Sequence, residues 1–80
     1  MTMPSERTRA LILAADFLHE LRSGSDTPDA IREQTIRVLR HFPETHSIEQ
    51  EAERQLHRQQ ESGKSSWLLP VDYYDRPKSP

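Results

Sequence analysis

The chain lacks cysteine altogether, which excludes disulfide bonds, thiolate chemistry and most structural zinc sites. It also lacks any apolar run approaching the roughly 18 residues that a membrane-spanning helix needs. The N-terminus does not show the basic-then-apolar order of a secretion signal, because Glu6 lies among its first basic residues. Together these absences favour a cytoplasmic protein that neither spans nor binds a membrane.

Apolar residues are scarce, and neither sign of charge dominates. Hydrophobic residues make up 32% of the 80 residues, charged residues make up 30%, and the net charge is −2. A chain of this length forms one domain with a modest core. Its charges form no strong basic stripe of the kind that binds a phosphate backbone, since residues 44–62 carry five glutamates against two arginines.

The apolar residues that are present concentrate in one run, Ala10–Ala15. On a helix, six consecutive apolar positions point all the way round the axis, because each residue turns by about 100°. We therefore predict a helix over residues 5–22 that more than one neighbour must cover. Gly24 is expected to follow it as a left-handed cap. The side chains that the neighbours must cover are Leu11, Ile12, Leu13 and Phe17.

A second helix is predicted over residues 28–41. Thr27 provides a hydroxyl cap and Pro28 suits the first helical position. Pro43 disfavours helical geometry at Phe42 and so ends the element. The short connector between the two amphipathic helices favours an antiparallel hairpin.

A third helix is predicted over residues 47–62, where Ser47 and Gln50 form a capping box. Its apolar stripe is only one side chain per turn, so this helix can lean on the hairpin but contributes little core. That stripe consists of Ile48, Ala52 and Leu56. The predicted fold is all-α: an antiparallel helical hairpin, a weaker and polar third helix, and an extended aromatic C-terminal tail.

The last part of the chain, residues 63–80, differs from the rest in composition. A Gly/Ser joint leads into an aromatic and proline-rich tail, so we predict a three-helix domain over residues 1–62 and a separate tail after it. The tail is too short to fold alone. It either docks across the first two helices of its own molecule or anchors another protein, because Trp and Tyr often carry interface energy.

Two clusters have residue types that could carry chemistry. Glu49, Glu53 and His57 form one row on the third helix, a spacing that can bind zinc, but a second histidine at i+4 is missing and a solvated face is expected. His19 and Glu20, with Asp16 one turn earlier, cluster near the end of the first helix without a nucleophile or a phosphate loop. We therefore expect no catalytic residue, no metal ligand and no cofactor.

The opening MTMPSERTRAL, the segment FLHEL and the segment LRHFP carry a resemblance. They are similar to those of a family of short, functionally uncharacterised bacterial proteins with an MTxPSERTRAL-like opening. The resemblance covers roughly the first half of the chain and implies a bacterial cytoplasmic protein. It supplies no activity, and the tail WLLPVDYY departs from it. The matching residues are Thr2, Pro4 to Leu11, Phe17, Leu18, and Leu39 to Pro43.

The sequence thus favours a small, non-enzymatic protein interaction or regulatory protein, whose partner is another protein or a second copy of itself. The alternative is a small DNA-binding regulator that uses the basic face of the second helix, although the acidic third helix argues against nucleic acid. The residues expected to contact a partner are Trp67, Leu68, Leu69, Tyr73 and Tyr74, with Arg37 and Arg40 as secondary polar contacts.

Overall fold

The computed structural model describes residues 2–76 of the chain, and these residues form helices without any strand. The all-α fold predicted from the sequence is confirmed. The elements in chain order are α1 (Pro4–Ser23), α2 (Asp29–His41), α3 (Thr45–Ser62) and the single 3-10 turn η1 (Tyr73–Asp75).

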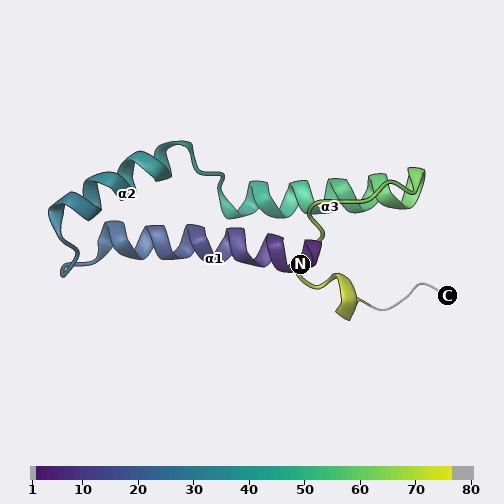
Figure 1. The fold of residues 1–80 in the computed structure, drawn as a ribbon, viewed down its shortest axis with the longest axis horizontal. Helices are drawn as coiled ribbons and strands as arrows, with labels where there is room; N and C mark the ends of the chain where they lie inside the picture. The colour runs from purple at the N-terminus through teal and green to yellow at the C-terminus, as the bar shows by residue number, and fades with distance from the viewer. Residues whose placement is uncertain (1, 77–80) are drawn as a thin grey trace.

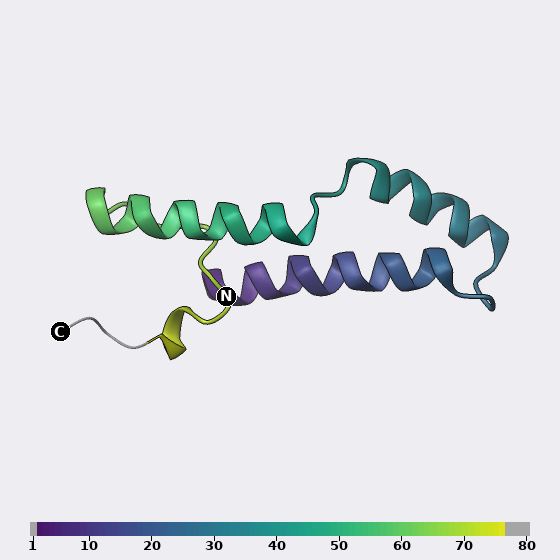
Figure 2. The ribbon, with the colours of Figure 1, turned by 180° about the vertical axis from the view of Figure 1, so that it is seen from behind.

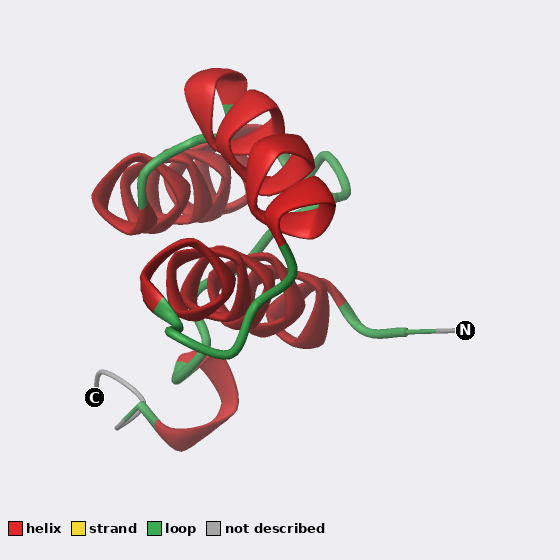
Figure 3. Cartoon of the chain, turned by 90° about the vertical axis from the view of Figure 1, so that its left-hand side faces the viewer, coloured by secondary structure: helices red, strands yellow, loops and turns green. Residues whose placement is uncertain are grey.

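The second and third helices both run antiparallel to α1 and follow one another along its length (Figure 1; Figure 2 gives the view from behind). α2 lies against the C-terminal half of α1, and α3 lies against its N-terminal half and extends beyond it. Seen end-on, α2 and α3 are on the same side of α1 (Figure 3). The antiparallel hairpin is confirmed, and α3 packs on α1 less extensively than α2 does. The molecule is elongated, with extents of 52 × 24 × 21 Å.

The end of α1 differs in detail from the prediction. Gly24 has φ −67° and ψ 131°, so it is extended and not left-handed. Its N–H still caps the helix by donating to the Glu20 carbonyl at 2.8 Å. A Cβ at this position would lie 2.8 Å from the Thr27 hydroxyl oxygen. Glycine therefore provides room for a close approach here, and the predicted left-handed cap is wrong.

The start of α3 also differs from the prediction. The helix begins at Thr45 with Glu44 as its cap residue, and no side chain caps it. The predicted capping box at Ser47 is wrong, because Pro43 forces Phe42 into an extended conformation and the helix starts directly behind it. At the other end, Gly63 has φ 71°, a left-handed conformation that glycine adopts without strain.

The apolar core lies between the N-terminal half of α1, α3 and the tail. α3 contributes the predicted stripe of Ile48, Ala52 and Leu56, and the tail contributes Leu68 and Leu69. The residues that α1 buries are all small: Ser5, Thr8 and Ala15. Small side chains let the backbone of the neighbouring segments approach the helix closely. α1 therefore provides a surface on which α3 and the tail pack, and it adds little fully buried side-chain volume of its own.

α1 is covered on some sides and open on another. Leu11 and Ile12 are half-buried on the sides that face the rest of the chain. Leu13 and Phe17 are each 59% exposed on the opposite side. The prediction that several neighbours cover this helix is right for its inner sides and wrong for its outer side. None of the helices within residues 2–76 is long and apolar enough to cross a membrane.

Candidate interaction surface

The tail is attached to the first turns of α1 through its own backbone. The Thr8 side chain is 1% exposed, and its hydroxyl donates to the Leu69 carbonyl at 2.6 Å. The Leu69 N–H in turn donates to the Pro4 carbonyl at 3.4 Å. Both polar groups of Leu69 are therefore paired with α1, which allows its side chain to be buried without unpaired backbone groups.

A single glutamine of α3 holds the other side of the tail. The Gln55 side-chain oxygen accepts hydrogen bonds from the Trp67 N–H at 3.0 Å and the Leu68 N–H at 2.8 Å. The Gln55 backbone carbonyl accepts a third bond from the Ser66 hydroxyl at 3.0 Å. Gln55 is itself buried, so water cannot replace these bonds, and loss of one of them would leave a polar group unpaired and lower the stability of the fold.

The tail thus docks in its own molecule, against α1 and α3. For a tail that docks in its own molecule, the sequence predicted contact with the first two helices. The predicted contact with α1 is right, and the predicted contact with α2 is wrong, because α3 holds the tail instead. The sequence analysis did not identify Gln55 as an anchor of the tail. The signal that could have found it is its position seven residues after Ile48, which places it on the buried side of α3. Residues 77–80 of the predicted tail lie outside the described residues.

An ion pair holds the end of the described tail. The Arg76 guanidinium donates to the Glu53 carboxylate through two nitrogens, and it also bonds Asp72 at 3.0 Å. The hydrogen bond from Arg76 lowers the pKa of the Glu53 carboxyl below its ordinary value of 4.5, against a smaller opposing effect of burial. Both side chains are more than one-third exposed, so the pair contributes only modestly to the stability of the fold.

The aromatic residues of the tail are exposed or half-buried, whereas the leucines between them are buried. Trp67 is 60% exposed, and its ring lies 5.7 Å from the guanidinium carbon of Arg7. The same arginine donates to the Trp67 carbonyl at 3.2 Å. Tyr73 and Tyr74 form an edge-to-face pair with centroids 4.9 Å apart, and Tyr74 is 60% exposed. Trp67 and Tyr74 therefore remain available to a partner, whereas Leu68 and Leu69 contact their own chain.

A second exposed apolar region lies on α1, on the side turned away from α2 and α3. We call it the α1 outer face. Its side chains recur at intervals of three and four residues, the spacing of one helical stripe. Arg7 precedes them at the same spacing, so Trp67 sits beside the N-terminal end of this face. The α1 outer face consists of Ala10, Leu13 and Phe17, which are exposed, and of Ala14 and Leu21, which are half-buried.

The predicted polar contacts on α2 lie apart from these surfaces. Arg37 and Arg40 are both exposed on α2. The α2 side chains Ile31, Ile36 and Val38 are partly exposed, between 41% and 48%. The structure places the seven predicted contact residues in two separate regions, with the tail at one end of α1 and α2 at the other.

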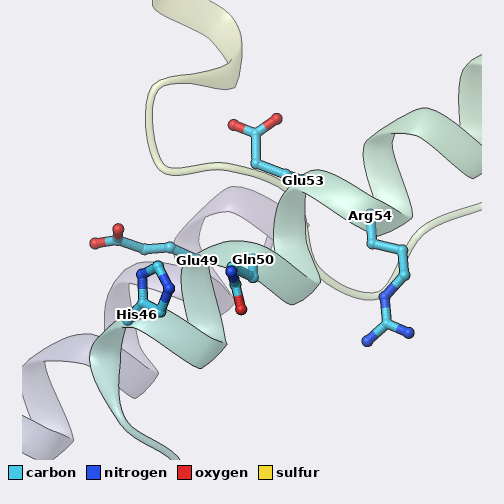
Figure 4. Close-up of a pocket in the computed structure, with 5 residues that line it drawn as sticks. All are labelled: His46, Glu49, Gln50, Glu53 and Arg54. Carbon is cyan, nitrogen blue, oxygen red and sulfur yellow. The ribbon is translucent and has the colours of Figure 1, made fainter.

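Two surface hollows lie on or beside α3. One is a shallow, open depression along α3, where His46 and Glu49 lie together while Glu53 and Arg54 point in different directions (Figure 4). A smaller hollow of about 240 Å³ lies beside the tail between Glu49 and Arg76. Within residues 2–76, no three His, Cys, Asp or Glu side chains are grouped so that they could hold a metal ion.

No protein-family model, curated protein or solved structure matches this chain. Sequence reasoning singled out Trp67 and Tyr74 as contact residues. It expected neighbouring segments to cover Leu13 and Phe17, although the apolar run Ala10–Ala15 contains Leu13 and ends two residues before Phe17.

Proposed function

We propose that this chain is a small, non-enzymatic cytoplasmic protein that works by binding another polypeptide through the α1 outer face and the adjoining Trp67. The single observation that carries the proposal is the exposure of Leu13 and Phe17, at 59% each, one helical turn apart. Soluble monomers rarely leave a contiguous apolar patch of this kind open unless it meets a partner.

The surroundings of this patch support the same function. Trp67 lies at the edge of the patch, held in place by Arg7 through both its ring and its carbonyl. Trp and Arg are among the residues that most often contribute strongly to binding energy at interfaces. The tail is fixed to the helices by buried hydrogen bonds, so Trp67 is presented in one position and needs little ordering on binding.

Affinity capture from the native cell with matched variants tests the proposal. We expect Phe17→Glu to lose a bound protein that the unchanged chain retains, because a carboxylate in an apolar contact is costly to desolvate. Val38→Glu places the same charge on a similarly exposed apolar residue of α2, and it should retain that protein. Identical captured proteins for all three chains would contradict the proposal.

The DNA-binding alternative rests on Arg37 and Arg40, and it remains a separate prediction. Binding through these arginines should weaken steeply as salt concentration rises, because each phosphate contact releases counterions. A fluorescence titration with generic duplex DNA at low salt measures this. Absence of binding at low salt, or binding that Arg37→Gln with Arg40→Gln does not reduce, would exclude this function.

A further inference from the structure

We propose that the α1 outer face binds the same face of a second copy of this chain, with the two α1 helices antiparallel about a two-fold axis near Leu13 and Ala14. This inference rests on the proposed interaction function and names the partner. It is carried by the arrangement of size and charge along the face, which is complementary to itself in only one of the two possible orientations.

The first argument is steric. Ala10 and Ala14 occupy the N-terminal half of the stripe, and Phe17 and Leu21 occupy the C-terminal half. With the axis between Leu13 and Ala14, Ala10 of one copy is level with Phe17 of the other. Phe17 of each copy then meets Ala10 of the other, and Leu13 meets Ala14, which is how helix surfaces interdigitate at close distance. A parallel pair would place the two Phe17 side chains level with each other and leave a gap between the alanines.

The second argument is electrostatic. Arg9 lies on the N-terminal half of one edge of the face, and Asp16 and Glu20 lie on the C-terminal half of the same edge, within an arc of about 40°. All three are exposed, and none of them makes an ion pair within the described part of the chain. Charged side chains of this kind can therefore contribute to the specificity of an association, when a partner places opposite charges beside them.

The two-fold axis brings these charges together with opposite signs. In an antiparallel pair, the same edge of each helix meets, so Arg9 of one copy comes level with the stretch between Asp16 and Glu20 of the other. A parallel pair would instead bring opposite edges together, and Arg9 would then lie beside the edge that carries Arg7, a like charge. Glu6 is the one charge that the antiparallel arrangement brings toward a like charge, at the ends of the contact where solvent screens it.

The third argument is access. α2 and α3 lie on the other side of α1, so neither of them covers the α1 outer face, and among the described residues only the tail passes to the far side of α1, at its N-terminal end (Figure 1; Figure 3). Trp67 lies at the N-terminal end of the face, beside Arg7. In the antiparallel arrangement it comes near Leu21 of the second copy, at the C-terminal end of that helix. The tail of each copy thus extends the contact at both ends.

Sedimentation equilibrium of the purified full chain tests the inference directly. A contact made mainly by one helix is smaller than the about 1,200 Å² of a standard interface, so dimers should form over about 1–500 μM. Phe17→Glu should remain monomeric throughout this range, and Val38→Glu should dimerise like the unchanged chain. Arg9→Glu should weaken dimerisation about tenfold, because it replaces two attractive contacts by repulsive ones. Far-UV circular dichroism confirms that each variant keeps its helices.

Disulfide trapping tests the orientation, because the chain contains no native cysteine. Glu6→Cys and Glu20→Cys chains should form a crosslinked dimer when mixed and oxidised, and little crosslink when each is oxidised alone. Efficient crosslinking of each variant with itself would overturn the antiparallel arrangement. A chain that is monomeric at every concentration would overturn the inference. If that monomer still captured a cellular protein that Phe17→Glu loses, the interaction function would stand without it.

Discussion

Thr8 and Gln55 are polar side chains at buried positions where helices more often place an apolar residue. Each one pairs with backbone groups of the tail, Thr8 with the Leu69 carbonyl and Gln55 with two consecutive N–H groups. Among residues 2–76, no buried side-chain nitrogen or oxygen lacks a hydrogen-bond partner. These two residues therefore allow an irregular segment to be buried, because a strand or helix is not present to pair its backbone.

Replacing Gln55 should reveal how much this pairing contributes. Gln55→Leu keeps the volume but leaves the N–H groups of Trp67 and Leu68 without a partner, so we expect a loss of about 2 kcal/mol in the free energy of unfolding. Chemical denaturation followed by the fluorescence of Trp67, the only tryptophan, measures this. The control is Gln50→Leu, at an exposed position of α3, which should change stability by less than about 0.5 kcal/mol. Equal effects of the two substitutions would contradict the role of Gln55.

The Glu53–Arg76 pair should make stability depend on pH in the acid range. The pKa of Glu53 is lower in the folded chain than its ordinary value of 4.5, so its contribution is complete above about pH 4.5 and is lost as the pH falls through the folded pKa. We expect Glu53→Gln to be less stable than the unchanged chain at pH 7, by less than about 1 kcal/mol because the pair is partly exposed.

That difference should shrink toward zero as the pH falls below about 4.5, since protonation then removes the charge from Glu53 in both folded and unfolded chains. Denaturation curves recorded between neutral and acid pH measure it. Arg76→Gln should show the same convergence, because it removes the other half of the pair. A difference that stays constant with pH would show that packing, and not charge, accounts for the effect of Glu53→Gln.

At the scale of the elements, the tail functions as a fourth structural segment without regular secondary structure. It runs back along α3 and crosses the N-terminal end of α1 (Figure 1). Leu68 and Leu69 are buried with the helices, while Trp67 directly before them is exposed. Neighbouring residues in this segment therefore have different roles: the leucines hold the fold together, and the tryptophan faces outward.

Alanine substitutions within the tail should separate these two roles. Leu69→Ala should lower the free energy of unfolding by about 2–5 kcal/mol, because it opens a cavity where a side chain only 4% exposed is packed. Trp67→Ala should lower it by less than about 1 kcal/mol, since that ring is 60% exposed. Thermal melts followed by circular dichroism measure both. A large loss for Trp67→Ala would mean that the ring supports the fold and is not free for a partner.

The sequence predicted the helices better than their ends and better than the docking of the tail. Alternation of apolar and polar residues is a local property, so α1, α2 and the Ile48, Ala52, Leu56 stripe were all predicted. The capping box predicted at Ser47 was wrong, because Thr45 and His46 before it already belong to α3. Thr8 could not be predicted as a buried anchor, since its partner lies 61 residues away and only the folded chain brings them together.

At the scale of the whole molecule, the overlap of α1 and α3 is partial. α1 accounts for about 30 Å of the 52 Å length at 1.5 Å per residue, so about 20 Å of the molecule lies beyond it. The C-terminal part of α3 forms the larger overhang, past the start of α1, and the connector with the start of α2 forms a smaller one past the end of α1 (Figure 2). The molecule is therefore asymmetric along its long axis, and its two possible dimers differ in length.

Small-angle X-ray scattering should detect this difference. An antiparallel dimer across the α1 outer face places one α3 overhang at each end, so its maximum dimension should exceed that of the monomer. A parallel dimer places both overhangs at the same end and keeps the length of the monomer. Phe17→Glu at the same concentration provides the monomer reference. A dimer no longer than this reference would contradict the antiparallel arrangement.

The clasp between Thr8 and Leu69 has a consequence for how the protein is made. The first turns of α1 are completed by a segment that follows them by 61 residues, so a chain that is still being synthesised leaves this edge of α1 without its partner until all three helices have been made. Emergence of the segment around Leu69, and not emergence of the helices, is therefore the event that lets the molecule close.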